Sequence, residues 1–379
     1  MKIVNICVTG QYDENFSYQE NLLTDYFRDS NIDTVIIASN LTPNTPGRKK
    51  YKLGEFDDNG KKLIRIKCFK ISNDFVIQLG LWKKLTQEKP DIIFHHNLNF
   101  SSLIVSTIYK RLHRNTVFFA DNHADYITRT KNKFWRFFYH GNILKTAVKL
   151  ATPHIRKFYG VAPSRCDYLR DVFNIPKDKI FLLPLGTDTK AAESIKESKQ
   201  KLREKYSLSS NSFIFISGGK MGKDKGTPDL INAVNELRNT DLADITLILF
   251  GSFTDKETEE LTKEHSDSVI FKGWQDHLTV LELLKLSDAA VWSVRHTTLM
   301  EDAISVNTPL LVCKSRTTEH LIEGNGLFIE PSDYDNLLST MRLFIENQTR
   351  SSYSEYCNAM REKLDYKNIV KRILIDARN

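Results

Sequence analysis

The chain has 379 residues, a mass of 43.8 kDa and a formal net charge of +7 at pH 7. Its 41% hydrophobic and 27% charged residues are typical of a folded globular protein and exclude a disordered or fibrous chain, and its length suits two domains. No apolar run reaches the roughly 20 residues of a membrane-spanning helix. The N-terminal MKIVNICVTG predicts a strand and shows no signal-peptide pattern.

The first half of the chain alternates strand and helix patterns. Strands are predicted at 2–8, 33–38, 63–71, 90–94 and 116–120, and helices at 18–29, 78–87 and 101–112. This alternation predicts a doubly wound parallel sheet, whose functional loops lie at the carboxyl ends of the strands. Polar residues follow several of these ends, so we expect binding residues at Gln11, His96, Asn122 and Asp125.

A locally basic region follows, because between residues 110 and 157 the only acidic residues are Asp121 and Asp125. Residues 134–159 predict one or two long helices, and the run from Lys131 to His140 interleaves basic and aromatic residues. Such a run suits single-stranded nucleic acid, an anionic membrane surface, or an ordinary half-buried helix. No RNA-binding signature accompanies it, which favours the membrane over nucleic acid as a functional interpretation.

The second half repeats the pattern after a charged connection at 191–205. Strands are predicted at 213–217, 245–250, 269–271, 289–293, 310–313 and 327–329. The five cysteines are odd in number and lack zinc spacing, so we expect reduced packing residues in a cytoplasmic protein.

The stretch from Phe213 to Leu237 joins the strongest strand, loop and helix signals. Gly218 and Gly219 are predicted to end the strand, and Thr227 is predicted to cap the helix that follows. A glycine-rich loop before a helix N-terminus often binds phosphate, because free backbone N–H groups point at the ligand and glycine lets the backbone approach it closely.

Three lysines, Lys220, Lys223 and Lys225, add positive charge to this loop. The spacing fits neither the Walker loop nor the dinucleotide fingerprint, which weakens an ATPase or dehydrogenase interpretation. A solvated lysine-rich turn is the plain alternative.

This loop resembles that of glycosyltransferase family 4. Gly219-Lys220, four residues and then Lys225-Gly226 match its Gly-Arg-x4-Lys-Gly element, with lysine in place of arginine at 220. Further matches occur at Ser164, at 184–188, at Phe250-Gly251 and at 271–274.

The resemblance implies a GT-B fold, an α/β architecture of two facing Rossmann-like, doubly wound domains with a cleft between them. Residues 1–190 would bind the acceptor, 191–365 would bind a nucleotide-diphosphate sugar donor, and the helix at 366–379 would pack back on the first domain. The four binding residues proposed above would then lie on the acceptor side. The transfer would retain configuration and use no cofactor.

The resemblance also assigns roles within the donor site. Lys220 and Lys225 would hold the diphosphate, Glu301 the ribose, and His123 the transferred sugar. Further donor contacts would come from Gly218, Gly219, Gly226, Thr227, His296, Thr297, Thr298, Gly273 and Trp274. The first glutamate of the family's Glu-x7-Glu element is absent, because Ser293 occupies its place.

No metal site is predicted. Adjacent residues on a strand point apart, so His95 and His96 do not form a ligand pair, and Asp333-Tyr-Asp335 stands at a predicted helix start. We therefore expect the enzyme to be independent of metal.

The resemblance implies an enzyme that moves a sugar to a glycan or lipid-linked acceptor, in bacterial cell-surface polysaccharide synthesis. A nucleotide-sugar epimerase or hydrolase, and a non-catalytic binding subunit, are the alternatives.

Overall fold

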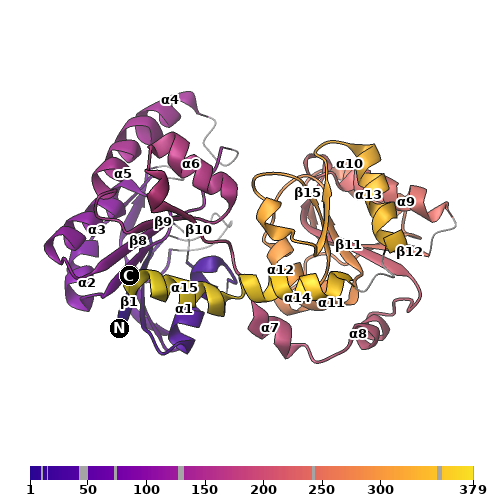
Figure 1. The fold of residues 1–379 in the computed structure, drawn as a ribbon, viewed down its shortest axis with the longest axis horizontal. Coiled ribbons are helices and arrows are strands. Elements are labelled where there is room, and N and C mark those ends of the chain that lie inside the picture. The colour runs from indigo at the N-terminus through magenta and orange to yellow at the C-terminus, as the bar shows by residue number, and fades with distance from the viewer. Residues whose placement is uncertain are drawn as a thin grey trace. The chain divides into compact units, whose positions relative to one another are not determined.

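The structure is a computed structural model that describes residues 1–9, 12–14, 16–41, 50–71, 75–126, 132–240, 244–347 and 352–378. The chain divides into two compact units, Met1–Pro184 with Ile369–Asn379, and Leu185–Asn368 (Figure 1). The boundary expected at residue 190 falls inside α7 (Thr189–Ser194), just beyond the point where the units part.

The first unit is built on an eight-stranded sheet in the order β10-β9-β8-β7-β1-β2-β4-β3. Strands such as KIVNIC and DTVIIAS are buried along most of their length, as strands of a parallel sheet covered on both faces should be. All neighbours are parallel except β3 and β4. The bounds are β1 (Lys2–Cys7), β2 (Asp33–Ser39), β3 (Gly54–Asp58), β4 (Lys61–Ile66), β7 (Ile92–His95), β8 (Val117–Asn122), β9 (Lys157–Gly160) and β10 (Ile180–Leu182), with a separate hairpin of β5 (Cys68–Lys70) and β6 (Val76–Gln78).

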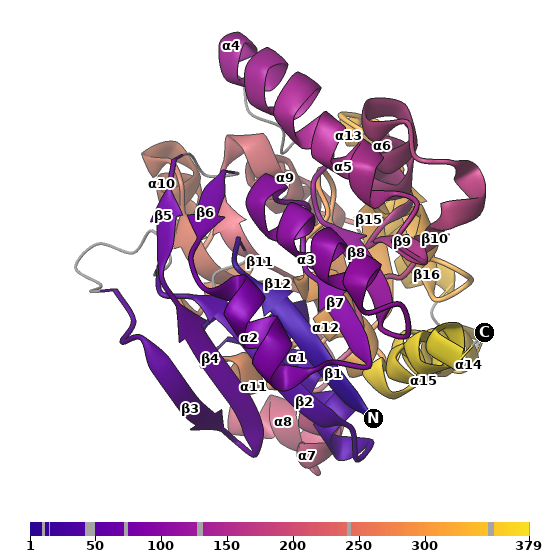
Figure 2. The same ribbon diagram turned by 90° about the vertical axis from the view of Figure 1, so that its left-hand side faces the viewer.

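Helices cover both faces of this sheet. Residues of α2, α3 and α6 share one hydrophobic core with the sheet, whereas α1 (Gln19–Asp29) packs on β1, β2 and β4 outside that core. Figure 2 shows β1, β2, β4 and β3 running side by side, with α2 and α3 nearby. The bounds of the remaining elements are α2 (Leu81–Glu88), α3 (Phe100–Leu112), α4 (Lys133–Trp135), the π-helical η1 (Arg136–Leu144), α5 (Lys145–Ala151), α6 (Pro163–Phe173), the short η2 (Lys177–Lys179) and α15 (Tyr366–Arg378).

The C-terminal helix α15 is fastened to the first unit by Asp376. Its carboxylate accepts hydrogen bonds from the buried Tyr159 hydroxyl at 2.7 Å and from Lys157 Nζ at 2.8 Å. Arg156 Nη1 donates to the carbonyl of Ala377 at 2.7 Å.

The second unit has a six-stranded, fully parallel sheet in the order β13-β12-β11-β14-β15-β16. One core lies under α11 and α12, and a second lies under α9 and α13. The strands are β11 (Phe213–Met221), β12 (Ile245–Phe253), β13 (Val269–Phe271), β14 (Ala289–Trp292), β15 (Leu310–Cys313) and β16 (Gly326–Ile329). The helices are α7, α8 (Lys199–Lys205), η3 (Lys223–Lys225), α9 (Thr227–Arg238), α10 (Lys256–Glu264), α11 (His277–Leu286), α12 (Leu299–Ser305), η4 (Glu319–Leu321), α13 (Tyr334–Asn347) and α14 (Ser352–Leu364).

Each sheet has a point at which the strand order reverses. In the first unit the chain moves one way from β1 to β2 and the other way from β7 to β8. In the second unit the reversal falls between β11 and β14. Ligands of doubly wound sheets bind at such switch points, outside the carboxyl ends of the strands.

Several predicted boundaries are wrong. The strand predicted at 63–71 divides into β4 and β5, and the helix predicted from residue 78 begins at Leu81, after β6. The helical segment predicted to reach residue 159 ends at Ala151, and Tyr159 lies in β9 instead. The strand predicted to end before Gly218 continues to Met221.

Candidate functional site

A pocket of about 240 Å³ lies at the switch point of the second unit. The ends of β11 and β14, the loop after each strand and the start of α9 form its walls. Its lining residues are Ser217, Gly218, Lys220, Met221, Lys225, Thr227, Trp292, Val294, Arg295, His296 and Thr297.

The two glycines of β11 have a packing role in place of the predicted strand-ending role. Gly218 and Gly219 remain paired with Phe250 and Gly251 of β12. A Cβ on Gly218 would lie 2.4 Å from the Phe250 ring, so only glycine lets the two strands run side by side here. The carbonyl of Gly218 accepts a hydrogen bond from the Trp292 indole at 3.1 Å, which joins β11 to β14 under the pocket.

The start of α9 differs from the prediction in one respect. The N-cap is Gly226, with φ of +70°, and Thr227 is the first helical residue. Thr227 uses its hydroxyl to accept from the Gly222 N–H at 3.2 Å, and its own N–H donates to the Gly222 carbonyl at 3.3 Å. Because Pro228 has no N–H, this helix start offers fewer free donors than expected, and the lysines carry more of the attraction for an anion.

The three loop lysines are not equivalent. Lys223 forms an ion pair with Glu257 and does not line the pocket. Lys225 lines it, and its ion-pair partner is the exposed Asp224, a full 4.0 Å away. Lys220 also lines it and makes no ion pair within the part of the chain that the structure describes. Two of the three loop lysines therefore remain available at the pocket wall, where the exposed Arg295 adds a third cation.

Behind the pocket wall lies Glu301, in the first turn of α12 as predicted. Its side chain is 3% exposed, and its Oε1 lies 2.9 Å from His296 Nε2. The second oxygen, Oε2, is buried and has no hydrogen-bond partner in the described structure. A buried carboxylate oxygen without a donor is costly, so this atom is poised to accept from a bound hydroxyl.

Other predicted donor residues lie around this pocket or outside its wall. Thr297 lines it, whereas Thr298 is the N-cap of α12 and makes no side-chain capping bond. Gly273 and Trp274 follow β13 and do not line it. Trp274 is 80% exposed, so its ring is free to stack on a ligand.

A second polar cluster occupies the switch point of the first unit. Asp121, fully buried at the end of β8, accepts from His96 Nδ1 at 2.9 Å and from His123 Nε2 at 3.3 Å. Its other oxygen accepts from the Asn97 N–H at 2.7 Å. Burial alone would raise the pKa of Asp121, but the two histidines outweigh it and hold that pKa well below its usual value.

The contact between Asp121 and His123 shifts the pKa of the histidine in the opposite direction. Burial disfavours the imidazolium, yet the Asp121 carboxylate outweighs burial and raises the pKa of His123. His95 points away from this cluster and bonds Ser102 and the Asn97 carbonyl. Burial lowers the pKa of His95 to about 4.

The remaining acceptor-side candidates differ in their surroundings. Asn122, the last residue of β8, holds the turn that follows, because its amide donates to the carbonyls of Ala124 and Arg165. Asp125 is buried and lies 3.4 Å from Arg165 Nη2. Gln11 lies outside the described residues.

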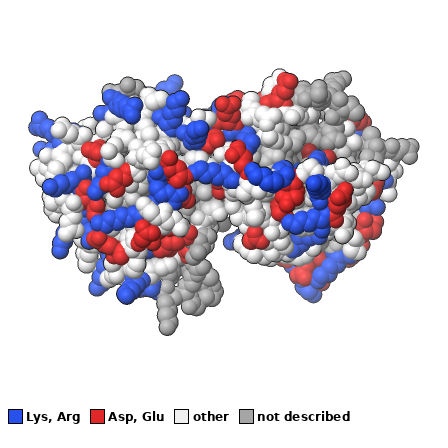
Figure 3. Space-filling view, turned by 90° about the horizontal axis from the view of Figure 1, so that it is seen from below, with Lys and Arg blue, Asp and Glu red and all other residues white. Residues whose placement is uncertain are grey.

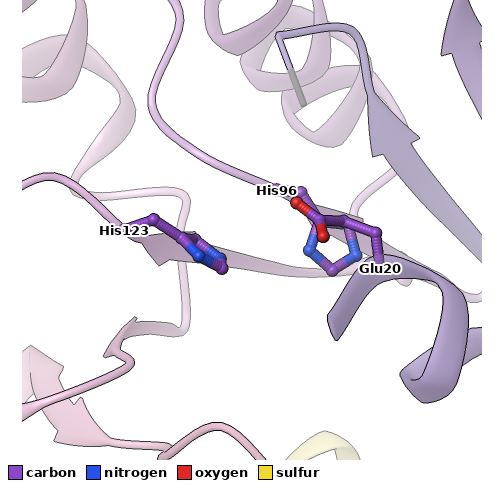
Figure 4. A group of neighbouring side chains, drawn as sticks. All are labelled: Glu20, His96 and His123. Atoms are coloured by element: carbon purple, nitrogen blue, oxygen red, sulfur yellow. The ribbon is translucent and has the colours of Figure 1, made fainter. Parts of the chain in front are cut away.

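Sequence reasoning missed Glu20. Its carboxylate, His96 and His123 each offer an atom within 4.8 Å of the atoms offered by the other two (Figure 4). In sequence Glu20 is only an acid at a helix start. The signal that finds it is topological, since α1 begins at the carboxyl edge of β1, beside β7.

The basic and aromatic run lies in α4 and η1. Phe134, Phe137 and Phe138 are 69%, 72% and 46% exposed, whereas Tyr139 of the same segment is buried against Phe75. These three exposed rings, which we name the aromatic face, belong to the same first unit as the exposed basic residues Arg111, Arg114 and Lys149. On the side of the molecule shown in Figure 3, cations and carboxylates are interspersed. Lys131 lies outside the described residues.

None of the helices within the described ranges is both long and apolar enough to cross a membrane. The five cysteines are free thiols, four of them buried.

Comparisons with known proteins match both halves of the chain. Residues 22–191 match the family described as Glycosyltransferase Family 4, and residues 198–364 match Glycosyl transferases group 1. A comparison with curated protein sequences found no match.

Solved structures share the fold over nearly the whole chain. A glycosyltransferase from Rickettsia africae ESF-5 has a TM-score of 0.70 at 14% identity, covering 99% of this chain and 97% of that one. Anabaena Alr3699/HepE, in complex with UDP and glucose, has a TM-score of 0.66 at 16% identity, covering 99% and 98%. WaaG, a glycosyltransferase involved in lipopolysaccharide biosynthesis, has a TM-score of 0.65 at 14% identity, covering 98% of each chain.

The two family matches together span both Rossmann-like units, and two of the solved structures that share the fold, the Rickettsia africae protein and WaaG, are glycosyltransferases. The chain therefore belongs to the family 4 type of GT-B glycosyltransferases.

Proposed function

We propose that this glycosyltransferase takes its sugar from a nucleotide-diphosphate donor bound in the pocket of the second unit. The observation that carries the proposal is the pairing of two available cations with a buried, unpartnered carboxylate oxygen at one switch point. That Anabaena Alr3699/HepE was solved with UDP and glucose supports a nucleotide-sugar donor.

In this proposal Lys220 and Lys225 hold the diphosphate. Negative charge builds on the diphosphate as its bond to the sugar breaks, and two cations already in place stabilise that charge. Lysine is a point charge without the planar fork of arginine, so Lys220 attracts the phosphates without fixing their orientation.

Glu301 Oε2 accepts a hydrogen bond from a ribose hydroxyl, while Oε1 stays on His296. Trp274 stacks on the donor, and His123 orients the transferred sugar. We propose retention of configuration on the strength of the family resemblance alone. Metal independence is proposed because the two lysines supply the charge that a divalent ion would otherwise provide.

The acceptor proposed is a glycan or lipid-linked glycan of a cell-surface polysaccharide. WaaG, which shares the fold, is involved in lipopolysaccharide biosynthesis. The aromatic face and Arg136 of the same segment suit an anionic membrane surface, because exposed rings enter the interface and cations meet the headgroups. We propose a cytoplasmic protein that meets the inner side of that membrane, and the five free thiols agree with a reducing compartment.

A donor panel tests the proposal. Purified protein is incubated with UDP-, GDP- and ADP-sugars, with and without membrane extract, and nucleotide release and sugar configuration are followed. Acceptor-dependent release of a nucleoside diphosphate is the expected result. Epimerised sugar, release without acceptor, or binding without turnover would each contradict it.

A further inference from the structure

Three potential metal ligands converge in the first unit, apart from the donor pocket. Glu20 comes from the first turn of α1, His96 follows β7, and His123 follows β8. Figure 4 shows the Glu20 carboxylate beside the His96 ring, with the His123 ring pointing toward both. One ligand atom of each lies within 4.8 Å of the others.

The two imidazoles are held in the way that metal-binding imidazoles usually are. His96 and His123 each direct one ring nitrogen to Asp121, a carboxylate that is itself buried and anchored by the Asn97 N–H. Such a carboxylate fixes the ring and its tautomer, so that the opposite nitrogen keeps its lone pair for a metal.

The surroundings of these ligands are rich in acceptors and poor in donors. Among the described residues, the Glu20 carboxylate has no hydrogen-bond partner. Within the same residues, the contact of His96 Nε2 with Asn5 Oδ1 is a long one, 3.4 Å, and two acceptors face each other there because His96 Nδ1 donates to Asp121. Acceptor lone pairs that face one another without an N–H or O–H between them repel each other, and a bound cation would stabilise them.

The ligand types select the class of metal. Two imidazoles and one carboxylate suit Zn²⁺ and its transition-metal neighbours, whereas Mg²⁺ prefers oxygen ligands. Donor atoms in a tetrahedral zinc site with bonds of about 2.1 Å lie about 3.4 Å apart. A set whose atoms are at most 4.8 Å apart needs to close by at most about 1.4 Å, and the half-buried Glu20 and His123 side chains can make that movement.

We propose that Glu20, His96 and His123 bind one Zn²⁺ ion, with Asp121 as the carboxylate that orients both histidines. A bound ion engages the His123 imidazole and prevents it from orienting the sugar. Zn²⁺ is therefore an inhibitor of transfer. The inhibition depends on the function proposed above, whereas the binding does not.

The binding test needs no substrate. Protein stripped with EDTA and desalted is titrated with ZnCl₂ by calorimetry, and with Co²⁺ by visible absorption. We expect one ion per chain. His96→Ala and Glu20→Gln should each weaken binding at least 10-fold, within the range known for altered metal sites. His154→Ala, in the same unit but outside the cluster, is the matched control and should bind like the parent.

Two results would overturn the site: no stoichiometric binding, or binding that both Glu20→Gln and His96→Ala leave unchanged. Glu20 is half-buried, so its variant remains informative if the His96 variant fails to fold, which circular dichroism shows. Binding without inhibition of sugar transfer would retain the metal site and reject the role of His123. Absence of transfer in metal-free protein would instead count against the proposed function.

Discussion

Replacing Lys225 with alanine tests the diphosphate assignment most directly. Lys225 lines the pocket of the second unit, and among the residues that the structure describes its ion pair is the 4.0 Å contact with the exposed Asp224. An exposed pair of this kind contributes at most about 1 kcal/mol. The substitution removes no core contact, so we expect the free energy of unfolding to change by only about 0.5 kcal/mol.

The effect on catalysis should be much larger. Removing one preorganised donor from a developing anion costs about 100- to 1,000-fold in kcat. The Lys225 side chain is 34% exposed, so solvent screens part of its charge and the lower end of that range applies. We expect a loss of about 100-fold in kcat for Lys225→Ala.

Lys223 provides a matched control two residues away. It has the same charge and lies in the same loop, but it pairs with Glu257 and does not line the pocket. Initial rates of nucleotide release and melting temperatures are measured for both alanine variants. Parent-like turnover of Lys225→Ala, or an equal loss in Lys223→Ala, would refute the assignment of the two cations.

Four further predictions follow from the same structure. Glu301→Gln should raise the donor KM about 10-fold or more, since a hydrogen bond to a charged group contributes about 1.5–3 kcal/mol; an unchanged KM would exclude a donor contact. EDTA should not lower initial rates, and strict dependence on added Mg²⁺ or Mn²⁺ would contradict metal independence. Asp121→Asn should lower the pKa of His123, followed by NMR titration, because it removes the charge that raises it. In the parent, protonated His123 stabilises the fold fully below a pH of about 6.5, and this stabilisation is lost as the pH rises through the raised pKa of the folded state. A stability difference between parent and variant that does not change with pH would contradict the predicted pKa effect. Replacing Phe134, Phe137 and Phe138 with serine should weaken binding to anionic vesicles, and so should 0.5 M salt, which screens the charge of Arg136. Binding that neither change weakens would indicate an ordinary half-buried helix.

The α/β alternation and the family motifs predicted the fold class because both are local signals. Runs such as FIFIS and ITLILF are short apolar stretches of β-branched and aromatic residues, which favour buried strands of a parallel sheet over helices. Boundaries depend on tertiary contacts. From the sequence, Gly218 is predicted to end a strand, yet β11 continues through it, because a glycine is needed where the Phe250 ring of β12 lies close.

The candidate sites were only partly predictable, for a related reason. Lys220 and Lys225 lie in one short motif, so their common location could be read from the chain. Glu20, His96 and His123 are separated by long stretches of sequence and meet only where the sheet order reverses. Adjacent His95 and His96 attract attention first, but their side chains bond to different groups.

The missing first glutamate of the Glu-x7-Glu element changes the way in which the donor must be held. Ser293 packs against Gly226, at the end of the loop that carries Lys225, since a Cβ on Gly226 would lie 2.7 Å from the Ser293 hydroxyl. Position 293 therefore supports the loop that carries Lys225 and does not extend a carboxylate toward a sugar. Glu301 is left with one free oxygen, because Oε1 is engaged by His296. Because the proposed function assigns Glu301 to the ribose and position 293 offers no carboxylate, we expect sugar selectivity to come from other pocket residues, with His296 and Thr297 among the polar candidates on its wall.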